Sequence, residues 1–202
     1  MIDKVKDYFG ARSTSVMING HSYPFLNKPE REVRFCEAVH YSFNLPIEIN
    51  DQTLSCPGAR RTFGYDNQGR DLVKMISDNT GIPKSQVNKA LNEIPVFDIP
   101  VENIILGVPA DLEEELMPDV YIAYTHPHRV MDFIHHAAQK SIKPVFPPYS
   151  IHSICGNIFS RAYHNQEITI SFGCPESRNF GGVGKDEAIV GIPQKMARNL
   201  FK

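Results

Sequence analysis

Prolines and glycines interrupt this chain of 202 residues so often that it can form only short helices and strands. There are fifteen prolines and thirteen glycines. Proline fixes φ and lacks a backbone N–H, so it breaks helices and is excluded from central strands, while glycine favours turns. Between these breaks, apolar residues at helical spacing alternate with β-branched runs. We therefore expect a mixed α+β (α/β) fold of short, interleaved elements.

The positions of these elements follow from the same patterns. No linker divides the chain, so we expect a single compact domain over residues 1–202, with a faint internal repeat that concerns the cysteines. Strands are expected at residues 13–18, 104–108, 120–124, 168–172 and 188–192. Helices are expected from Lys28 through Cys36 to Phe43, at residues 71–77, 85–91 and 125–140, from Ser150 to Ala162, and at the C-terminus.

Charge and hydropathy exclude several classes of partner. The formal net charge is −2, so there is no basic excess to bind nucleic acid. The longest apolar runs, such as residues 104–108, are far too short to cross a bilayer. Residues 1–7 are charged and do not resemble a signal peptide. We expect a cytoplasmic protein without membrane or nucleic-acid partners, in which cysteines are normally reduced.

The four cysteines form two pairs of nearly equal spacing. Cys36 precedes Cys56 by twenty residues, and Cys155 precedes Cys174 by nineteen. The first member of each pair lies on the apolar stripe of an expected helix. This correspondence suggests two pseudo-repeated halves that each contribute two thiolates to one site. The alternative is that all four are ordinary core thiols, because free cysteine often behaves as a small buried hydrophobe.

The second member of each pair begins a shared phrase. Residues 56–60 read Cys-Pro-Gly-Ala-Arg, and residues 174–178 read Cys-Pro-Glu-Ser-Arg. Proline after cysteine favours the first turn of a helix, whose free N–H groups attract an anion. A sulfur placed there is expected to have a lowered pKa. Arg60 and Arg178 would add positive charge, so we expect both to contact an anion or substrate.

Several occupants of such a site remain open. Four thiolates suit an iron–sulfur cluster, with a four-iron, four-sulfur cluster the favoured form, and they also suit tetrahedral zinc. The cysteines lack the close spacing of zinc knuckles and of ferredoxins, so spacing does not decide between them. A third possibility is a metal-free thiol-dependent enzyme with Cys56 or Cys174 as its nucleophile. These readings predict, respectively, electron transfer or cluster-based chemistry, a zinc-stapled binding module, and covalent catalysis.

Histidines provide weaker candidates. His40 follows Cys36 by four residues, so both can lie on one helix face, and His40 could assist the site as a hydrogen-bond partner or ligand. A satisfied core histidine is the simpler interpretation. His128, His135 and Asp132 fall opposite the apolar stripe of their expected helix, which is typical of a solvated face.

Segments around the cysteines also carry a family resemblance. They read Arg-Phe-Cys-Glu-Ala-Val at 34–39, Ser-Cys-Pro-Gly-Ala at 55–59, Ile-Cys-Gly at 154–156, Gly-Cys-Pro-Glu-Ser-Arg at 173–178, Asp-Glu at 186–187 and Gly-Ile-Pro at 191–193. In these segments the chain resembles the prokaryotic family called domain of unknown function 169. The family's usual phrase is Cys-Pro-Gly-Gly, and this chain has Ala59 at the second glycine.

The resemblance has limited implications for function. It implies cysteines at positions like Cys36, Cys56, Cys155 and Cys174, and it carries no known reaction. Members of the family are common in anaerobes and methane-producing archaea, which suits an oxygen-sensitive cluster. With the cysteine phrases, it leads us to expect an iron–sulfur protein whose partner is a redox protein or a small-molecule substrate.

Overall fold

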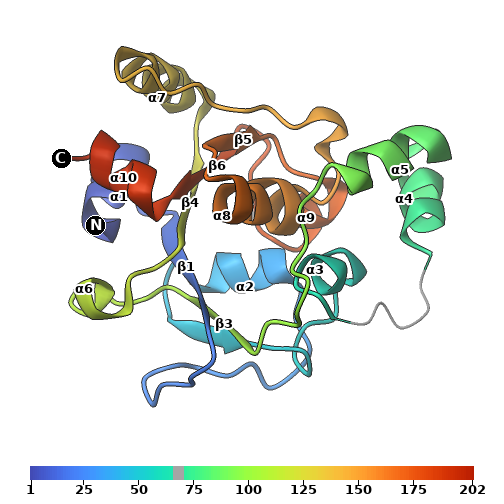
Figure 1. The fold of residues 1–202 in the computed structure, drawn as a ribbon, viewed down its shortest axis with the longest axis horizontal. Coiled ribbons are helices and arrows are strands. Elements are labelled where there is room, and N and C mark those ends of the chain that lie inside the picture. Colours follow the sequence, from blue (N-terminus) through green and yellow to red (C-terminus); the bar gives the residue numbers. More distant parts are fainter. Residues whose placement is uncertain (66–70) are drawn as a thin grey trace.

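The structure is a computed structural model that describes residues 1–65 and 71–202. Within these residues, one antiparallel sheet of six strands runs through the molecule in the order β2-β3-β1-β4-β6-β5. Helices cover both faces of the sheet (Figure 1). The strands are β1 (Ser13–Asn19), β2 (Ile47–Ile49), β3 (Asn103–Leu106), β4 (Val120–Thr125), β5 (Thr169–Ser171) and β6 (Ala188–Pro193).

The helices divide into two layers and a separate pair. One layer contains α1 (Ile2–Phe9), α7 (Pro127–Gln139) and α10 (Gln194–Leu200). The other contains α2 (Phe35–Tyr41), α3 (Pro57–Thr62), the π-helix η2 (Ser153–Ser160), α8 (Arg161–Asn165) and α9 (Pro175–Asn179). The pair α4 (Leu72–Thr80) and α5 (Lys84–Asn92) has its own small core. The short elements α6 (Glu113–Leu116) and η1 (Pro148–Ser150) complete the described fold.

Strand residues alternate between the two cores, as the two-residue period of a strand requires. On β4, Val120, Ile122 and Tyr124 face the core beneath the second helix layer, and Tyr121 and Ala123 face the opposite core. Both faces of β4 are therefore buried, and the strand is apolar along nearly its whole length. The second layer contains all four cysteines, so the sheet separates the candidate site from the α1–α7–α10 side.

The internal repeat expected from the cysteines is present in the topology. Each half has the order strand, cysteine helix, strand, Cys-Pro helix, strand: β1-α2-β2-α3-β3 and β4-η2-β5-α9-β6. From one edge the sheet reads β2-β3-β1, and from the other it reads β5-β6-β4. Matching parallel bridges join Asn27 to Ile47 and Val145 to Thr169. The halves are thus related by an approximate twofold axis through the antiparallel β1–β4 pair.

The structure confirms the mixed α+β fold and corrects several element boundaries. The helix expected from Lys28 begins only at Phe35, and residues 28–34 are not helical. The segment expected to form an α-helix from Ser150 is instead mainly the π-helix η2. The sequence patterns missed α1 and the three-residue strand β2. In the acidic stretch at 113–115, Glu113 is buried and its carboxylate accepts hydrogen bonds from Met1 and Ile2.

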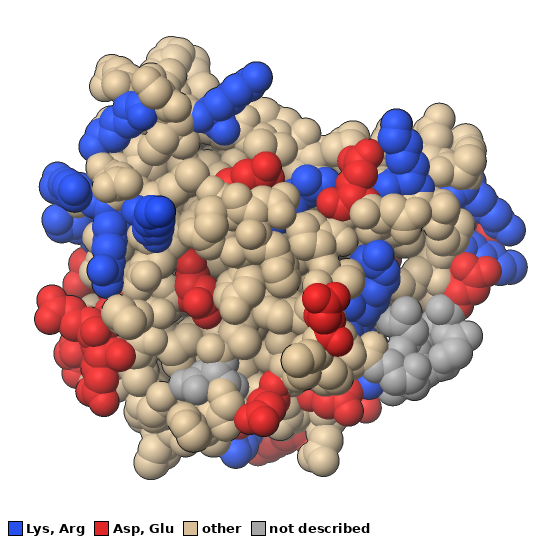
Figure 2. Space-filling view, in the orientation of Figure 1, with Lys and Arg blue, Asp and Glu red and all other residues tan. Residues whose placement is uncertain are grey.

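Figure 2 shows Lys and Arg side chains gathered at the upper left of this face, directly above a group of acidic side chains, and charges of both signs elsewhere. The acidic residues at the lower left overlie α6 in the same view. None of the described helices combines the length and the apolar character that a membrane crossing requires.

Candidate thiolate site

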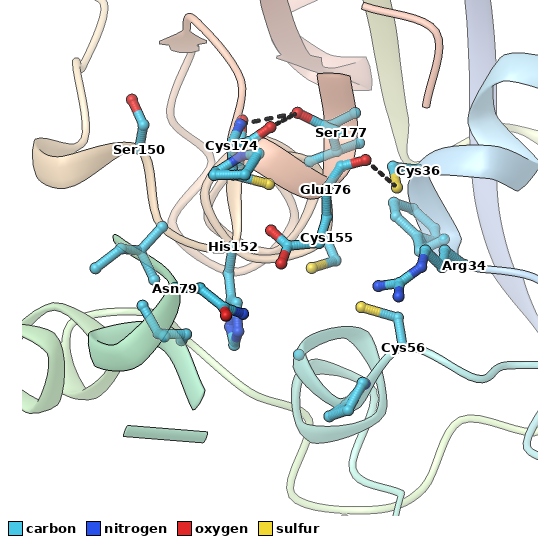
Figure 3. Close-up of a pocket in the computed structure, with 18 of the residues that line it drawn as sticks. Arg34, Cys36, Cys56, Asn79, Ser150, His152, Cys155, Cys174, Glu176 and Ser177 are labelled. Atoms are coloured by element: carbon cyan, nitrogen blue, oxygen red, sulfur yellow. Dashed lines mark hydrogen bonds between the residues drawn. The ribbon is translucent and has the colours of Figure 1, made fainter. Parts of the chain in front are cut away.

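All four cysteines line one cavity in the second helix layer. The cavity has a volume of about 180 Å³, far more than the roughly 10–15 Å³ that one buried water needs. The four are free cysteines, and Figure 3 shows their sulfurs around the same region. Cys36, Cys155 and Cys174 are buried, and Cys56 is half-buried. The expectation that the two pairs come together in one place therefore agrees with this geometry.

The positions of the cysteines repeat between the halves. Cys56 and Cys174 each occupy the N-cap of a short helix that has proline at its first position, as the Cys-Pro phrases predict. Cys36 lies in the first turn of α2, and Cys155 lies in η2. Both of these helices pack on the hydrophobic core that lies between the second helix layer and the sheet. Each half thus contributes one cysteine from a buried helix and one from a helix start.

The backbone around Cys155 is unusual. Residues 153–160 form a π-helix, a rare form that occurs often at functional sites. Just before it, Tyr149, Ser150 and His152 have positive φ angles of 64°, 46° and 43°. Such angles are costly for residues other than glycine and persist only where the surrounding structure enforces them. Asn157 helps to hold this segment, because its side-chain amide donates to the Ile151 carbonyl.

Backbone N–H groups surround the sulfurs. The Ser177 N–H donates to the Cys174 sulfur, and the Cys174 N–H donates to the Ser177 hydroxyl at 2.8 Å. The backbone groups of Ser153, Glu37 and Gly156 lie near enough to Cys174, Cys36 and Cys155, respectively, to oppose the rise in pKa that burial causes. N–H donors of this kind stabilise charge on sulfur.

Burial nevertheless has the larger effect on the thiols. It raises the pKa of Cys36, Cys155 and Cys174, because a thiolate loses its hydration inside the protein. Neighbouring cysteines raise the pKa of Cys36 and Cys155 further. The prediction of a lowered pKa at a helix start is thus wrong for Cys174. The helix α9 has only five residues, too few for its N-terminus to offset burial.

The cation that lines the cavity is Arg34, rather than either arginine of the shared phrases. Arg34 lies two residues before Cys36, and its guanidinium is 4.3 Å from the centre of the Phe180 ring. It has no carboxylate partner among the residues that the structure describes. Its charge acts on Cys36, where it opposes the rise in pKa caused by burial.

Arg60 and Arg178, the predicted anion contacts, lie outside the cavity lining. The Arg60 guanidinium pairs with Asp51 at 2.5 Å and donates to the Leu54 carbonyl at 3.0 Å. Arg178 donates to the backbone carbonyls of Phe172 and Gly184. Both arginines brace the loops around the Cys-Pro turns, because a helix of one or two turns directs a side chain at its end away from its N-cap.

His40 also lies outside the lining, although it shares α2 with Cys36. Its Nδ1 is buried and has no hydrogen-bond partner in the described part of the chain. The ring lies against Gly182, where an added Cβ would come within 2.6 Å of Nδ1. In the same loop Gly181 lies against Cys36, and an added Cβ there would be only 2.8 Å from the Cys36 Cβ.

Like Arg34, His152 is a residue of this site that sequence reasoning missed. It lines the cavity, its ring lies against Gly58, and its Cβ lies near Gly156. An added Cβ on Gly58 would lie 2.4 Å from its Nε2, and one on Gly156 would lie 3.2 Å from its Cβ. Its separation of three residues from Cys155 is the only signal in the sequence, and the irregular backbone between them makes that spacing uninformative.

Four cysteines can hold a single zinc ion or an iron–sulfur cluster, and the two require different arrangements of the sulfurs. Among residues 1–65 and 71–202, no three His, Cys, Asp or Glu side chains converge closely enough to bind one metal ion. In a zinc site every sulfur is about 2.3 Å from the same ion, so the four must nearly touch. In a four-iron, four-sulfur cluster each of the four cysteines binds a different iron, so the sulfurs surround a larger body. The four cysteines of this chain line a shared cavity and do not converge on one ion-sized point in the described residues.

Residues 18–202 match the profile of DUF169, domain of unknown function 169, described as "Uncharacterised ArCR". The chain belongs to this family. The match covers all four cysteine positions and confirms the resemblance noted in the sequence. Comparisons with curated proteins and with solved structures found no match.

Proposed function

We propose that this DUF169 protein binds an iron–sulfur cluster, most simply a four-iron, four-sulfur cluster, through Cys36, Cys56, Cys155 and Cys174. The observation that carries the proposal is that all four cysteines, two from each half, line one cavity of about 180 Å³. Independent core thiols would have no reason to meet across an approximate twofold axis. The spread of the sulfurs favours a cluster over a single zinc ion.

The surrounding groups suit an anionic cluster. Thiolates held by iron would be deprotonated despite their burial, because coordination to a cation outweighs desolvation. The N–H groups near Cys36, Cys155 and Cys174 would stabilise charge on the sulfurs. Arg34 would supply a positive charge, and no described carboxylate forms an ion pair with it. Bound in this way, the cluster would supply electron transfer or Lewis-acid chemistry.

We place this activity in the cytoplasm of an anaerobic prokaryote, with a redox protein or a small molecule as partner. Support for a reducing compartment comes from the four free cysteines, which would otherwise be open to oxidation. Whether three or four cysteines bind iron distinguishes an open, substrate-binding cluster from a closed one, because an iron without a cysteine can bind a substrate.

The test is purification without oxygen, followed by measurement of iron, acid-labile sulfide and the visible spectrum. We expect iron and sulfide in equal amounts, near four of each per chain, and a brown protein. Serine at each cysteine position in turn should lower the iron content or change the spectrum, because serine provides a hard oxygen in place of a soft sulfur.

A matched control is Ala123→Ser, which adds the same hydroxyl to the opposite core, behind the sheet. This variant should retain its iron even if it is less stable. A protein that is colourless and cannot be reconstituted with iron and sulfide would contradict the proposal. Zinc near one per chain without visible absorbance would favour the zinc-stapled module instead.

A further inference from the structure

The cavity extends beyond the four sulfurs to a second end that has no cysteine. There it is bounded by α4 and by the segment 150–152, and its wall is largely apolar. Uncharged polar groups from Asn79, Thr80 and Ser150 interrupt this wall. An enclosed apolar space with a few polar groups is the usual form of a small-molecule site. The residues of this end are Leu72, Met75, Ile76, Asn79, Thr80, Ser150, Ile151 and His152.

This end breaks the twofold pattern of the fold. In the first half, the chain forms α4 and α5 between the Cys-Pro helix α3 and β3. In the second half, only residues 180–187 connect α9 to β6. The cysteines therefore follow the repeat, whereas the α4 wall belongs to one half alone. A symmetric metal site does not require such a wall, so its presence points to an additional role.

His152 is the polar group at this end whose bonding is incomplete. Neither ring nitrogen has a hydrogen-bond partner in the described residues, and Nδ1 is fully enclosed. A neutral imidazole presents one N–H and one lone pair, so both a donor and an acceptor are left unsatisfied. The positive φ of His152 and the absence of side chains at Gly58 and Gly156 are what allow the ring to occupy this place. A strained, unsatisfied polar residue in a cavity indicates a missing partner.

Arg61 lies near His152 and affects its charge state. Burial and the nearby Arg61 charge lower the pKa of His152 to about 4, so the ring is neutral at pH 7. The Arg61 guanidinium donates to the Leu91 carbonyl at 3.0 Å, and its other terminal nitrogen is buried with no hydrogen-bond partner among the described residues. A neutral ring carries one proton, and a carboxylate ligand would select the tautomer with that proton on Nε2, the nitrogen beside Gly58.

We propose that the α4 end of the cavity binds a short-chain organic acid as its carboxylate. The carboxylate accepts hydrogen bonds from His152 Nε2–H and the Asn79 side-chain amide, and the carbon chain packs on Leu72, Met75 and Ile76. Arg61 and Arg34 make the surroundings favourable for a negative charge, and Glu176 is the acidic residue in the described lining. The inference rests on the proposed function for its chemistry, because the acid would lie next to the cluster as its substrate.

The test is calorimetric titration of the anaerobically purified protein at pH 7 with sodium acetate, propionate and butyrate. Propionamide serves as the uncharged counterpart of propionate, and sodium chloride matches the ionic strength. We expect at least one acid to bind about tenfold or more tightly than its amide, since a hydrogen bond to a charged group is stronger than one to a neutral group. His152→Phe and Asn79→Leu should each weaken that binding about tenfold or more.

His135→Phe, on the exposed face of α7, is the control and should bind like the unmodified protein. Asn79→Leu preserves a test if His152→Phe fails to fold. Equal binding of acid and amide, no binding of any acid, or unchanged binding in both cavity variants would overturn the inference. Iron and sulfide are measured on the same samples. If the protein contains the cluster but binds no acid, only the inference is refuted. If it binds an acid but contains no cluster, the proposed function is refuted and the acid site is still supported.

Discussion

Arg34 is the charged residue that acts most directly on the cysteine sulfurs. Its guanidinium lines the cavity, lies over the Phe180 ring and acts on Cys36. A nearby cation stabilises the more negative, reduced state of a cluster, so its removal should lower the reduction potential. We expect Arg34→Gln to lower the midpoint potential on the order of 50 mV. A redox titration followed in the visible spectrum would measure this shift.

The matched control is Arg198→Gln, an exposed position on α10 at the opposite side of the sheet. It should leave the potential unchanged. An unchanged potential in Arg34→Gln, with iron content retained, would show that Arg34 does not act on the cluster. A raised potential would contradict the electrostatic argument directly.

Asp119 lies away from the cavity and allows a test of how burial affects a carboxyl group. Its carboxylate accepts the Ile18 N–H at 2.8 Å, and burial raises the pKa of this carboxyl above its ordinary value. A carboxyl with a raised folded pKa contributes stability below its unfolded pKa of about 3.9 and loses it as pH rises. Asn keeps the accepting oxygen without the charge. Asp119→Asn should therefore increase the free energy of unfolding at pH 7, and this gain should shrink as pH falls toward 4.

Urea unfolding at pH 7, 5.5 and 4 would measure the effect. The exposed Asp111→Asn is the control, for which little change is expected at any pH. If Asp119→Asn were less stable than the unmodified protein at pH 7, the charged form of Asp119 would be stabilising and the argument from burial would fail.

The sequence predicted the positions of the four cysteines better than it predicted which residues surround them. The shared Cys-Pro phrases correctly gave helix starts at Cys56 and Cys174, because proline acts through local backbone geometry. Arg34 and His152 were missed because their roles depend on contacts with Phe180 and Gly58, which lie far away in the chain. The arginines of the phrases were assigned to the cavity because the sequence does not give the direction of a side chain at the end of a short helix.

At the scale of elements, the turn after α9 sets how closely the two halves pack. Gly181 lies against α2, and a Cβ added there would come within 2.8 Å of both the Cys36 Cβ and the Ser177 carbonyl oxygen. These are atoms that cannot move aside without shifting α2 or α9. We expect Gly181→Ala to cost roughly 1–3 kcal/mol in stability and to reduce iron content. Urea unfolding and iron analysis would measure both effects.

Gly20→Ala is its control, because the added Cβ there meets only the mobile end of the Glu102 side chain. It should alter neither property appreciably. Full iron content and unchanged stability in Gly181→Ala would mean that α2 can shift freely, contrary to the close packing described above.

Elements with regular patterns were predictable, and those set by tertiary contacts were not. The strands β4 and β6 were found because both are continuous apolar runs. The strand β2 has only three residues and depends on β3 for its hydrogen bonds, so its own sequence carries little signal. The π-helix could not be predicted, because its apolar stripe at residues 154–162 looks the same as that of an α-helix.

For the whole molecule, the approximate twofold axis explains why the cysteines occur as matched pairs. The axis runs through the β1–β4 pair, and all four cysteines belong to the second helix layer, on one side of the sheet. A cluster held by all four would tie the two halves together on this face of the sheet only. The opposite layer of α1, α7 and α10 has its own apolar core and no cysteine.

Removal of the cluster should therefore loosen one layer and spare the other. We expect amide hydrogen exchange to accelerate at least tenfold in α2 and η2 after anaerobic chelation of iron, equivalent to about 1.4 kcal/mol of lost local stability. Exchange in α7 and α10 should stay within about twofold of the loaded protein, because the sheet isolates their core. Mass spectrometry of peptides from each helix would give both rates in one experiment. Equal acceleration in both layers would indicate that the cluster stabilises the fold globally, and no acceleration in either would indicate that the cysteines do not join the two halves.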